Sequence, residues 1–164
     1  MKDYYIVHFI FQTASFYCIW YTEDTDGLIT EEGKLKYCSQ LSELYYYCNE
    51  NKINLNEEIT EYNLNNLFKW VLDNTTEIDC NYMLDTWNII SDIAHSLNER
   101  FYGDNNDVTD IYAKLFYGSN LPCINTGGEE YIPVWNAQEL EKLNKVFRSG
   151  ISILSEKCGF QLDS

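Results

Sequence analysis

The spacing of apolar residues changes along this chain, and that change limits the folds open to it. Residues 4–11 and 16–22 are rich in aromatic and β-branched side chains, which is typical of β-strands. Only four residues separate them, so we predict a β-hairpin with its turn at residues 12–15. The first run is apolar throughout, which predicts a central strand with both faces covered.

A second, weaker hairpin is predicted at residues 28–30 and 34–38, around the turn at residues 31–33. Helical spacing then begins behind Ser39, which is predicted to cap the first turn, with Leu41, Leu44, Tyr45 and Cys48 on one face. Residues 53–55 add at most one more extended segment. The strands therefore come first, and helices follow.

Four more helices are predicted from apolar stripes and caps. One follows Asn63 and carries Leu64, Leu67, Phe68, Val71 and Leu72. The longest covers residues 80–100 behind Asp79, and its stripe should pack on the sheet; the stripe consists of Met83, Trp87, Ile90, Ala94, Leu97 and, at its end, Phe101.

Two helices remain near the C-terminus. Residues 109–117 form one, which Gly118 is placed to end in the left-handed conformation. The last helix follows Asn136, which forms a capping box with Glu139, and Gly159 is placed to end it. Between the two, residues 120–135 hold both prolines and predict an irregular loop.

These elements predict the α+β class, with an N-terminal antiparallel sheet of about 3–5 strands packed against about 4–5 helices. A chain of 164 residues suits one domain, because domains cluster near 100–150 residues. We predict a single domain over residues 1–164, in which residues 1–38 are mainly strands and residues 39–164 mainly helices.

The net charge narrows the choice of partner. Eleven Lys and Arg face 26 Asp and Glu, a net charge of −15. This field repels nucleic-acid phosphates and anionic lipid headgroups, and it attracts basic proteins. We therefore expect neither direct nucleic-acid binding nor membrane binding. The alternative is that the acidity only keeps the protein soluble.

The N-terminus and the cysteines predict a compartment. The first residues hold one Lys, an Asp and a short apolar run without a small-residue cleavage site, and no apolar run approaches the roughly 20 residues of a membrane span. We predict a cytoplasmic protein. Its six cysteines are scattered singly, which disfavours zinc and predicts reduced, partly buried thiols.

No residue pattern predicts catalysis. His8 lies in the first strand and is expected to be a core histidine with both nitrogens hydrogen bonded, while His95 lies on the longest helix. A straight helix holds His95 roughly 22 Å from Cys80, which excludes a Cys-His pair. The acidic turn at residues 24–27 lacks the remaining ligands of a calcium loop, and residues 126–128 lack the Lys of a phosphate loop. We predict no catalytic residue, no metal and no cofactor.

Acidic turns beside aromatic residues are the best candidates for a binding surface. The candidate partner-binding residues are Glu23, Asp24, Asp26, Glu31, Glu32, Asp104, Asp107, Asp110, Tyr21 and Tyr102. The alternative is that these acids lie in solvated turns, and that Asp107 or Thr109 only caps a helix against its dipole.

The chain combines a small acidic α+β architecture with the hairpin at residues 4–22, the turn at residues 21–27, the segment Trp87 to Ala94 and Leu121-Pro122. In these features it resembles the bacterial immunity proteins of contact-dependent growth inhibition and related polymorphic toxin systems. The resemblance implies a protein that neutralises a cognate toxin by covering the basic nucleic-acid groove of a nuclease domain. Two other classes stay open: an acidic nucleic-acid mimic that inhibits a host nuclease, and a small-molecule-binding protein whose pocket is formed by dispersed residues such as Trp87, His95 and Tyr112.

Overall fold

The computed structural model describes residues 1–73 and 77–158 and has an α+β fold, as predicted. Its strands are β1 (Asp3–Phe11), β2 (Ala14–Thr22), β3 (Gly27–Leu28), β4 (Thr30–Glu31), β5 (Lys34–Leu35) and β6 (Leu55–Asn63). Its α-helices are α1 (Leu41–Glu50), α2 (Asn65–Leu72), α3 (Cys80–Ser96), α4 (Thr109–Gly118) and α5 (Ala137–Lys157). Two 3-10 turns, η1 (Tyr102–Asp104) and η2 (Asn106–Val108), precede α4.

The main sheet has the strand order β3-β2-β1-β6, so β1 is central as predicted. β1 pairs with β2 in an antiparallel hairpin whose turn is only Gln12 and Thr13, because Phe11 already faces Ala14. The expected four-residue turn was too long. The predicted second hairpin is also present, as β4 and β5 around Glu32 and Gly33, which both have positive φ.

Strand β6 is the main departure from the predicted fold. It runs parallel to β1, so the sheet is mixed and not antiparallel as expected. Sequence analysis placed at most a short extended segment at residues 53–55, whereas β6 spans Leu55–Asn63. Most of its side chains are exposed on both faces. Because neither face is buried, the strand lacks the apolar alternation by which strands are recognised.

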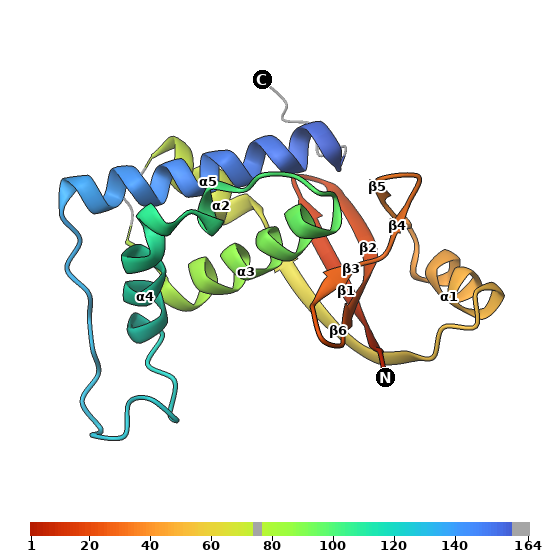
Figure 1. Ribbon diagram of the computed structural model, residues 1–164, viewed down its shortest axis with the longest axis horizontal. Coiled ribbons are helices and arrows are strands. Elements are labelled where there is room, and N and C mark those ends of the chain that lie inside the picture. The colour runs from red at the N-terminus through yellow and green to blue at the C-terminus, as the bar shows by residue number, and fades with distance from the viewer. Residues whose placement is uncertain (74–76, 159–164) are drawn as a thin grey trace.

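The sheet lies between helix α1 on one side and helices α2, α3, α4 and α5 on the other (Figure 1). On one side, Val7, Phe9 and Cys18 belong to the large apolar cluster that α2, α3, α4 and α5 complete. On the other side, Ile6 and Ile19 pack with Leu44 and Cys48 of α1 in a smaller cluster. This arrangement explains why the first strand is apolar on both faces.

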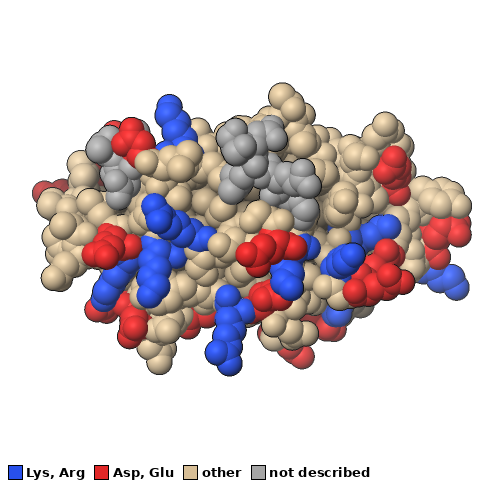
Figure 2. Space-filling model, turned by 90° about the horizontal axis from the view of Figure 1, so that it is seen from above, with Lys and Arg blue, Asp and Glu red and all other residues tan. Residues whose placement is uncertain are grey.

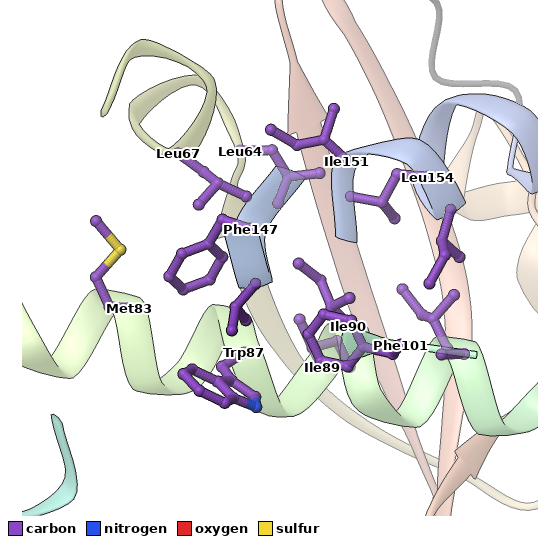
Figure 3. Close-up of a cluster of buried hydrophobic side chains, with 14 of the residues drawn as sticks. Leu64, Leu67, Met83, Trp87, Ile89, Ile90, Phe101, Phe147, Ile151 and Leu154 are labelled. Carbon is purple, nitrogen blue, oxygen red and sulfur yellow. The ribbon is translucent and has the colours of Figure 1, made fainter. Parts of the chain in front are cut away.

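Helices α3 and α5 cross closely in the large cluster. Figure 3 shows Phe147 of α5 directed toward α3 beside Trp87, and both side chains are buried. Gly150 permits the contact, because a Cβ there would lie 2.9 Å from Ile90 Cδ1. The stripe Met83, Trp87, Ile90 and Ala94 is buried as predicted, but it faces α5 as well as the sheet.

Helix α3 ends earlier than expected. It stops at Ser96 and not near Arg100, because Asn98 takes a φ of 54° and Glu99 N donates to Ala94 O at 2.8 Å. This turn redirects the chain and returns Phe101 to the core, where it is buried.

Other helix ends differ in detail. The N-cap of α1 is Gln40 and not Ser39. Gly118 has no positive φ, and Asn120 takes the left-handed conformation instead, with a φ of 52°. Gly118 serves for close packing, since a Cβ there would lie 2.6 Å from Cys80 Sγ. The expected stop at Gly159 lies outside the described residues.

Asn136 and Glu139 open α5 in a variant of the predicted capping box, in which the side-chain amide of Asn136 takes the place of its backbone N–H. Glu139 N donates to Asn136 Oδ1 at 2.9 Å, and Asn136 Nδ2 donates to the Glu139 carboxylate at 3.0 Å. We expect Asn136→Ala to lower the free energy of unfolding by about 1 kcal/mol, the usual loss for an N-cap. Urea denaturation measures it, with Gln138→Ala as the control, since Gln138 is an exposed neighbour with no capping role. Equal effects of the two substitutions would contradict this role.

The cysteines are free thiols, and all but Cys123 are buried. Burial raises the pKa of the Cys158 thiol to about 12, so it stays protonated and unreactive at neutral pH. Among the described residues, no helix is both long and apolar enough to cross a membrane.

Candidate functional site

An acidic cleft lies between α3 and the sheet and has a volume of about 350 Å³. Its walls come from four segments far apart in the sequence: β2, the turn before β3, β6 and α3. The lining residues are Trp20, Asp26, Tyr62, Asp85, Asn88, Ile89, Ser91 and Asp92. The cleft therefore combines three carboxylates with two aromatic rings.

The polar wall of the cleft is one face of α3. Asp85, Asn88 and Asp92 follow one another at intervals of three and four residues, so they share a side of the helix. This side is opposite to the stripe that contains Trp87 and Ile90. Asn88 Oδ1 accepts a hydrogen bond from Tyr112 Oη of α4 at 2.8 Å, which fixes the amide in place.

Hydrogen bonds from α3 hold the sheet side of the cleft. The indole Nε1 of Trp20 donates to Asp92 Oδ2 at 2.9 Å. Leu28 N donates to Ser96 Oγ at 2.9 Å, and Ser96 Oγ donates to Asp92 O at 2.7 Å. These bonds fix the end of the turn that carries Asp26, so the turn and helix present their carboxylates together.

Burial makes two carboxylates of the cleft, Asp85 and Asp92, harder to ionise. It raises the pKa of Asp92, and the charges of Asp26 and Asp104 raise it further, while the hydrogen bond from Trp20 and the nearby His95 lower it. Burial and the charge of Asp79 raise the pKa of Asp85. Burial, Asp85 and Asp92 together raise the pKa of Tyr62 to about 12. In residues 1–73 and 77–158, no Lys or Arg forms an ion pair with Asp26, Asp85 or Asp92.

The substitution Asp92→Asn is therefore expected to stabilise the free protein at neutral pH, by a fraction of a kcal/mol because the site is partly open to solvent. The amide oxygen can still accept from Trp20. Because the folded-state pKa of Asp92 is raised, the wild type gains stability as the pH falls through that pKa toward 3.8. The advantage of Asn should thus vanish in acid. Urea denaturation at several pH values measures it; an advantage that grows in acid would contradict the assignment.

The structure brings two of the predicted acidic residues to this cleft. Asp26 lines it. Asp104 of η1 lies close enough to affect the pKa of Asp92, and it accepts from Ser91 Oγ at 2.7 Å and pairs with His95 Nε2 at 2.9 Å. The turn before β3 and the segment before α4 therefore both lie near Asp92 of α3, which the sequence did not indicate.

The other predicted acids are exposed but lie elsewhere. Glu23 lies 3.9 Å from the N-terminal amine, and Asp24 is in the same exposed turn as Asp26. Glu31 and Glu32 belong to the β4-β5 hairpin, where Glu31 pairs with Lys36 at 3.4 Å. Asp107 lies in η2, and Asp110 lies in the first turn of α4.

The two tyrosines predicted as partner anchors already have cationic neighbours within the chain. Lys2 Nζ lies 4.3 Å from the ring centre of Tyr21, and Lys145 Nζ lies 4.1 Å from that of Tyr102. The aromatic rings that line the cleft are Trp20 and Tyr62 instead.

Neither histidine is arranged as expected. The prediction that both nitrogens of His8 are hydrogen bonded is wrong. Nδ1 lies 3.5 Å from Glu61 Oε2, but the buried Nε2 has no partner among the described residues. The ring stacks on Tyr17 with centres 4.3 Å apart, and this stacking determines its orientation. His95 is exposed while Trp87 is buried in the core, so these residues do not form the alternative pocket with Tyr112.

Sequence reasoning missed Tyr62, Asp85 and Asp92 as site residues. One indication was available: the spacing of Asp85, Asn88 and Asp92 marks a polar stripe on the longest helix. No local pattern indicates Tyr62, because β6 itself was not recognised.

Within the described part of the chain, no three His, Cys, Asp or Glu side chains are placed to hold a metal ion. Comparison of the chain with family models, curated proteins and solved structures found no match.

Proposed function

We propose that this protein binds and neutralises a basic partner protein, as an immunity protein does for its cognate toxin. In this proposal the acidic cleft receives a Lys or Arg side chain of the partner. One observation carries it: Asp26, Asp85 and Asp92 share a partly closed cleft, and no Lys or Arg of the described residues forms an ion pair with them.

The chemistry of the cleft suits a cationic side chain. Trp20 and Tyr62 offer aromatic surface, and a cation near an aromatic ring gains about 0.5–2 kcal/mol. The carboxylates accept charge-assisted hydrogen bonds. The pKa values of Asp85 and Asp92 are raised, first by burial and then by neighbouring carboxylates, so ionisation costs more in the cleft than in water. A bound cation offsets that cost.

The distribution of the remaining charges favours one localised interface. Helix α5 carries Lys142, Lys145, Arg148 and Lys157, and the face seen in Figure 2 has blue cations among the red acids. The negative charge is therefore unevenly distributed over the surface. A nucleic-acid mimic needs acids in a long stripe at phosphate spacing, whereas an immunity protein needs only a patch that fits its toxin.

The test is capture of a partner from the source cell with the tagged protein, followed by an assay of the partner's own activity. We expect one basic protein at stoichiometric yield, encoded next to this gene, whose toxicity or nuclease activity the purified protein suppresses. An acidic or neutral partner, or a basic one whose activity is unchanged in the complex, would contradict the proposal.

A further inference from the structure

The outer edge of the main sheet is β6, and it is open. β6 pairs with β1, and no other strand of the described residues lies against it. The opposite edge is the short strand β3, and the chain beyond it still bonds to β2, for example through Ile29 N and Ile19 O at 2.9 Å. A long edge with exposed backbone groups is a template for another strand.

The direction of the backbone groups on β6 follows from one hydrogen bond. Leu64 N donates to Ile10 O at 2.9 Å, so Leu64 faces β1. Because alternate residues of a strand point their N–H and C=O to the same side, Tyr62 and Thr60 face β1 as well, and Ile59 and Glu61 face outward. Asn63 also faces outward, but its carbonyl accepts from Tyr82 Oη.

The open part of the edge is thus centred on Ile59 and Glu61. Both residues lie opposite residues of β1 in the sheet. Among the described residues, no other backbone group forms a hydrogen bond with the outward N–H or C=O of Ile59 or Glu61. On the N-terminal side, the register between β1 and β6 shifts, since Tyr5 pairs with Asn56 and Ile6 with Ile59. The extra residues, Glu57 and Glu58, form a bulge there, which limits an added strand to the segment beyond it.

The negative charge of this edge favours a basic strand over a second copy of the same chain. Glu57, Glu58 and Glu61 are exposed on β6, and the chain carries a net charge of −15. A second copy would bring the same acids against them, and like charges on adjacent strands destabilise pairing. A basic strand would instead place Lys or Arg beside these glutamates.

We infer that β6 accepts an extended basic segment of the partner as an added strand. This inference rests on the proposed function and specifies how the same partner binds. Tyr62 connects the two surfaces, because it belongs to β6 and its ring lines the acidic cleft. A segment paired with Ile59 and Glu61 therefore runs past the cleft, and a neighbouring basic side chain can enter it.

The experiment uses the full chain and a synthetic octapeptide of alternating lysine and valine. Amide hydrogen exchange is followed by NMR at millimolar peptide. We expect exchange at Ile59 and Glu61 to slow at least tenfold, because their N–H groups become donors to the added strand. Thr60 is the internal control, since its N–H already faces β1. A peptide of alternating lysine and proline has the same charge but pairs poorly with a sheet, and it should give no protection.

Two proline variants check the geometry. Ile59→Pro removes an outward N–H, so it should leave the fold intact and weaken peptide binding at least tenfold. Thr60→Pro removes an N–H that faces β1, so it should lower the melting temperature markedly. If Ile59→Pro destabilises the fold as much as Thr60→Pro, the assigned backbone directions are wrong.

The two proposals have separate readouts. A peptide that shifts the Trp20 indole resonance but leaves Ile59 and Glu61 unprotected would overturn strand addition and leave the cleft as the binding site. A peptide that protects neither residue and shifts no resonance would also overturn strand addition. Protection at Ile59 and Glu61, together with loss of binding in Ile59→Pro, is the result that the inference requires.

Discussion

Replacing Phe147 with alanine is expected to lower the free energy of unfolding by about 3–5 kcal/mol, the usual range for a buried phenylalanine. Phe147 is fully buried, and its ring meets Trp70 and Trp87 edge to face at centre distances of 6.2 and 6.1 Å. It connects α5 with α2 and α3. The substitution leaves a cavity where these helices meet, at the centre of the large cluster.

Urea denaturation measures this loss. Leu72→Ala is the control, because Leu72 is 87% exposed, and surface substitutions usually change stability by less than about 0.5 kcal/mol. If Phe147→Ala does not fold, Phe147→Leu gives a smaller cavity and should lose less. A loss for Phe147→Ala no greater than that for Leu72→Ala would show that α5 does not pack on α3 as described.

The second large effect is expected on partner binding. Reversing charge in the cleft with Asp85→Lys and Asp92→Lys should weaken affinity at least a hundredfold, since like charges across an interface oppose each other by several kcal/mol. The two side chains occupy the cleft that, in our proposal, receives the cation. Binding is measured by calorimetry with the captured partner.

The matched control for this variant is Asp107→Lys with Asp110→Lys. It makes the same change in net charge but in η2 and the first turn of α4, so only the on-rate should fall. Asp85→Asn with Asp92→Asn removes charge while keeping an acceptor for Trp20, and it should weaken binding less. Equal losses in the Asp85/Asp92 and Asp107/Asp110 reversals would show that overall charge, and not the cleft, determines affinity.

The raised pKa values of Asp85 and Asp92 also predict how the affinity for the partner depends on pH. A cationic side chain binds the ionised carboxylates, and the pKa values of Asp85 and Asp92 are raised in the free protein. Affinity should therefore start to fall at a higher pH than it would for ordinary carboxyl groups. The Asn variants should lose this pH dependence.

The sequence predicted those elements whose burial pattern is simple. The β1-β2 hairpin and α3 have one or two buried faces and long apolar runs, and Asp79 caps α3, accepting from Tyr82 N at 3.1 Å. The start of α5 could also be predicted from the sequence, because Asn136 is followed three residues later by Glu139. Strand β6 escaped prediction because an exposed edge strand needs no apolar side chains.

The candidate site was predicted only in part, for a physical reason. Asp26 was identified because acidic turns are visible locally. The cleft, however, joins Trp20, Tyr62 and Asp92 from three elements, and only the tertiary fold brings them together. Tyr21 and Tyr102 were chosen as anchors because they lie beside acids in the sequence, but their rings lie next to Lys2 and Lys145 of the same chain.

The most direct test of the acidic cleft as the partner site is the indole N–H resonance of Trp20. This proton is donated to Asp92, so it reports on the cleft, and its absence in Trp20→Phe distinguishes it from the other three of the four tryptophans. On titration with the captured partner, we expect the Trp20 resonance to shift in proportion to complex formed, while that of buried Trp87 stays in place. A complex that forms without moving the Trp20 resonance would contradict the account.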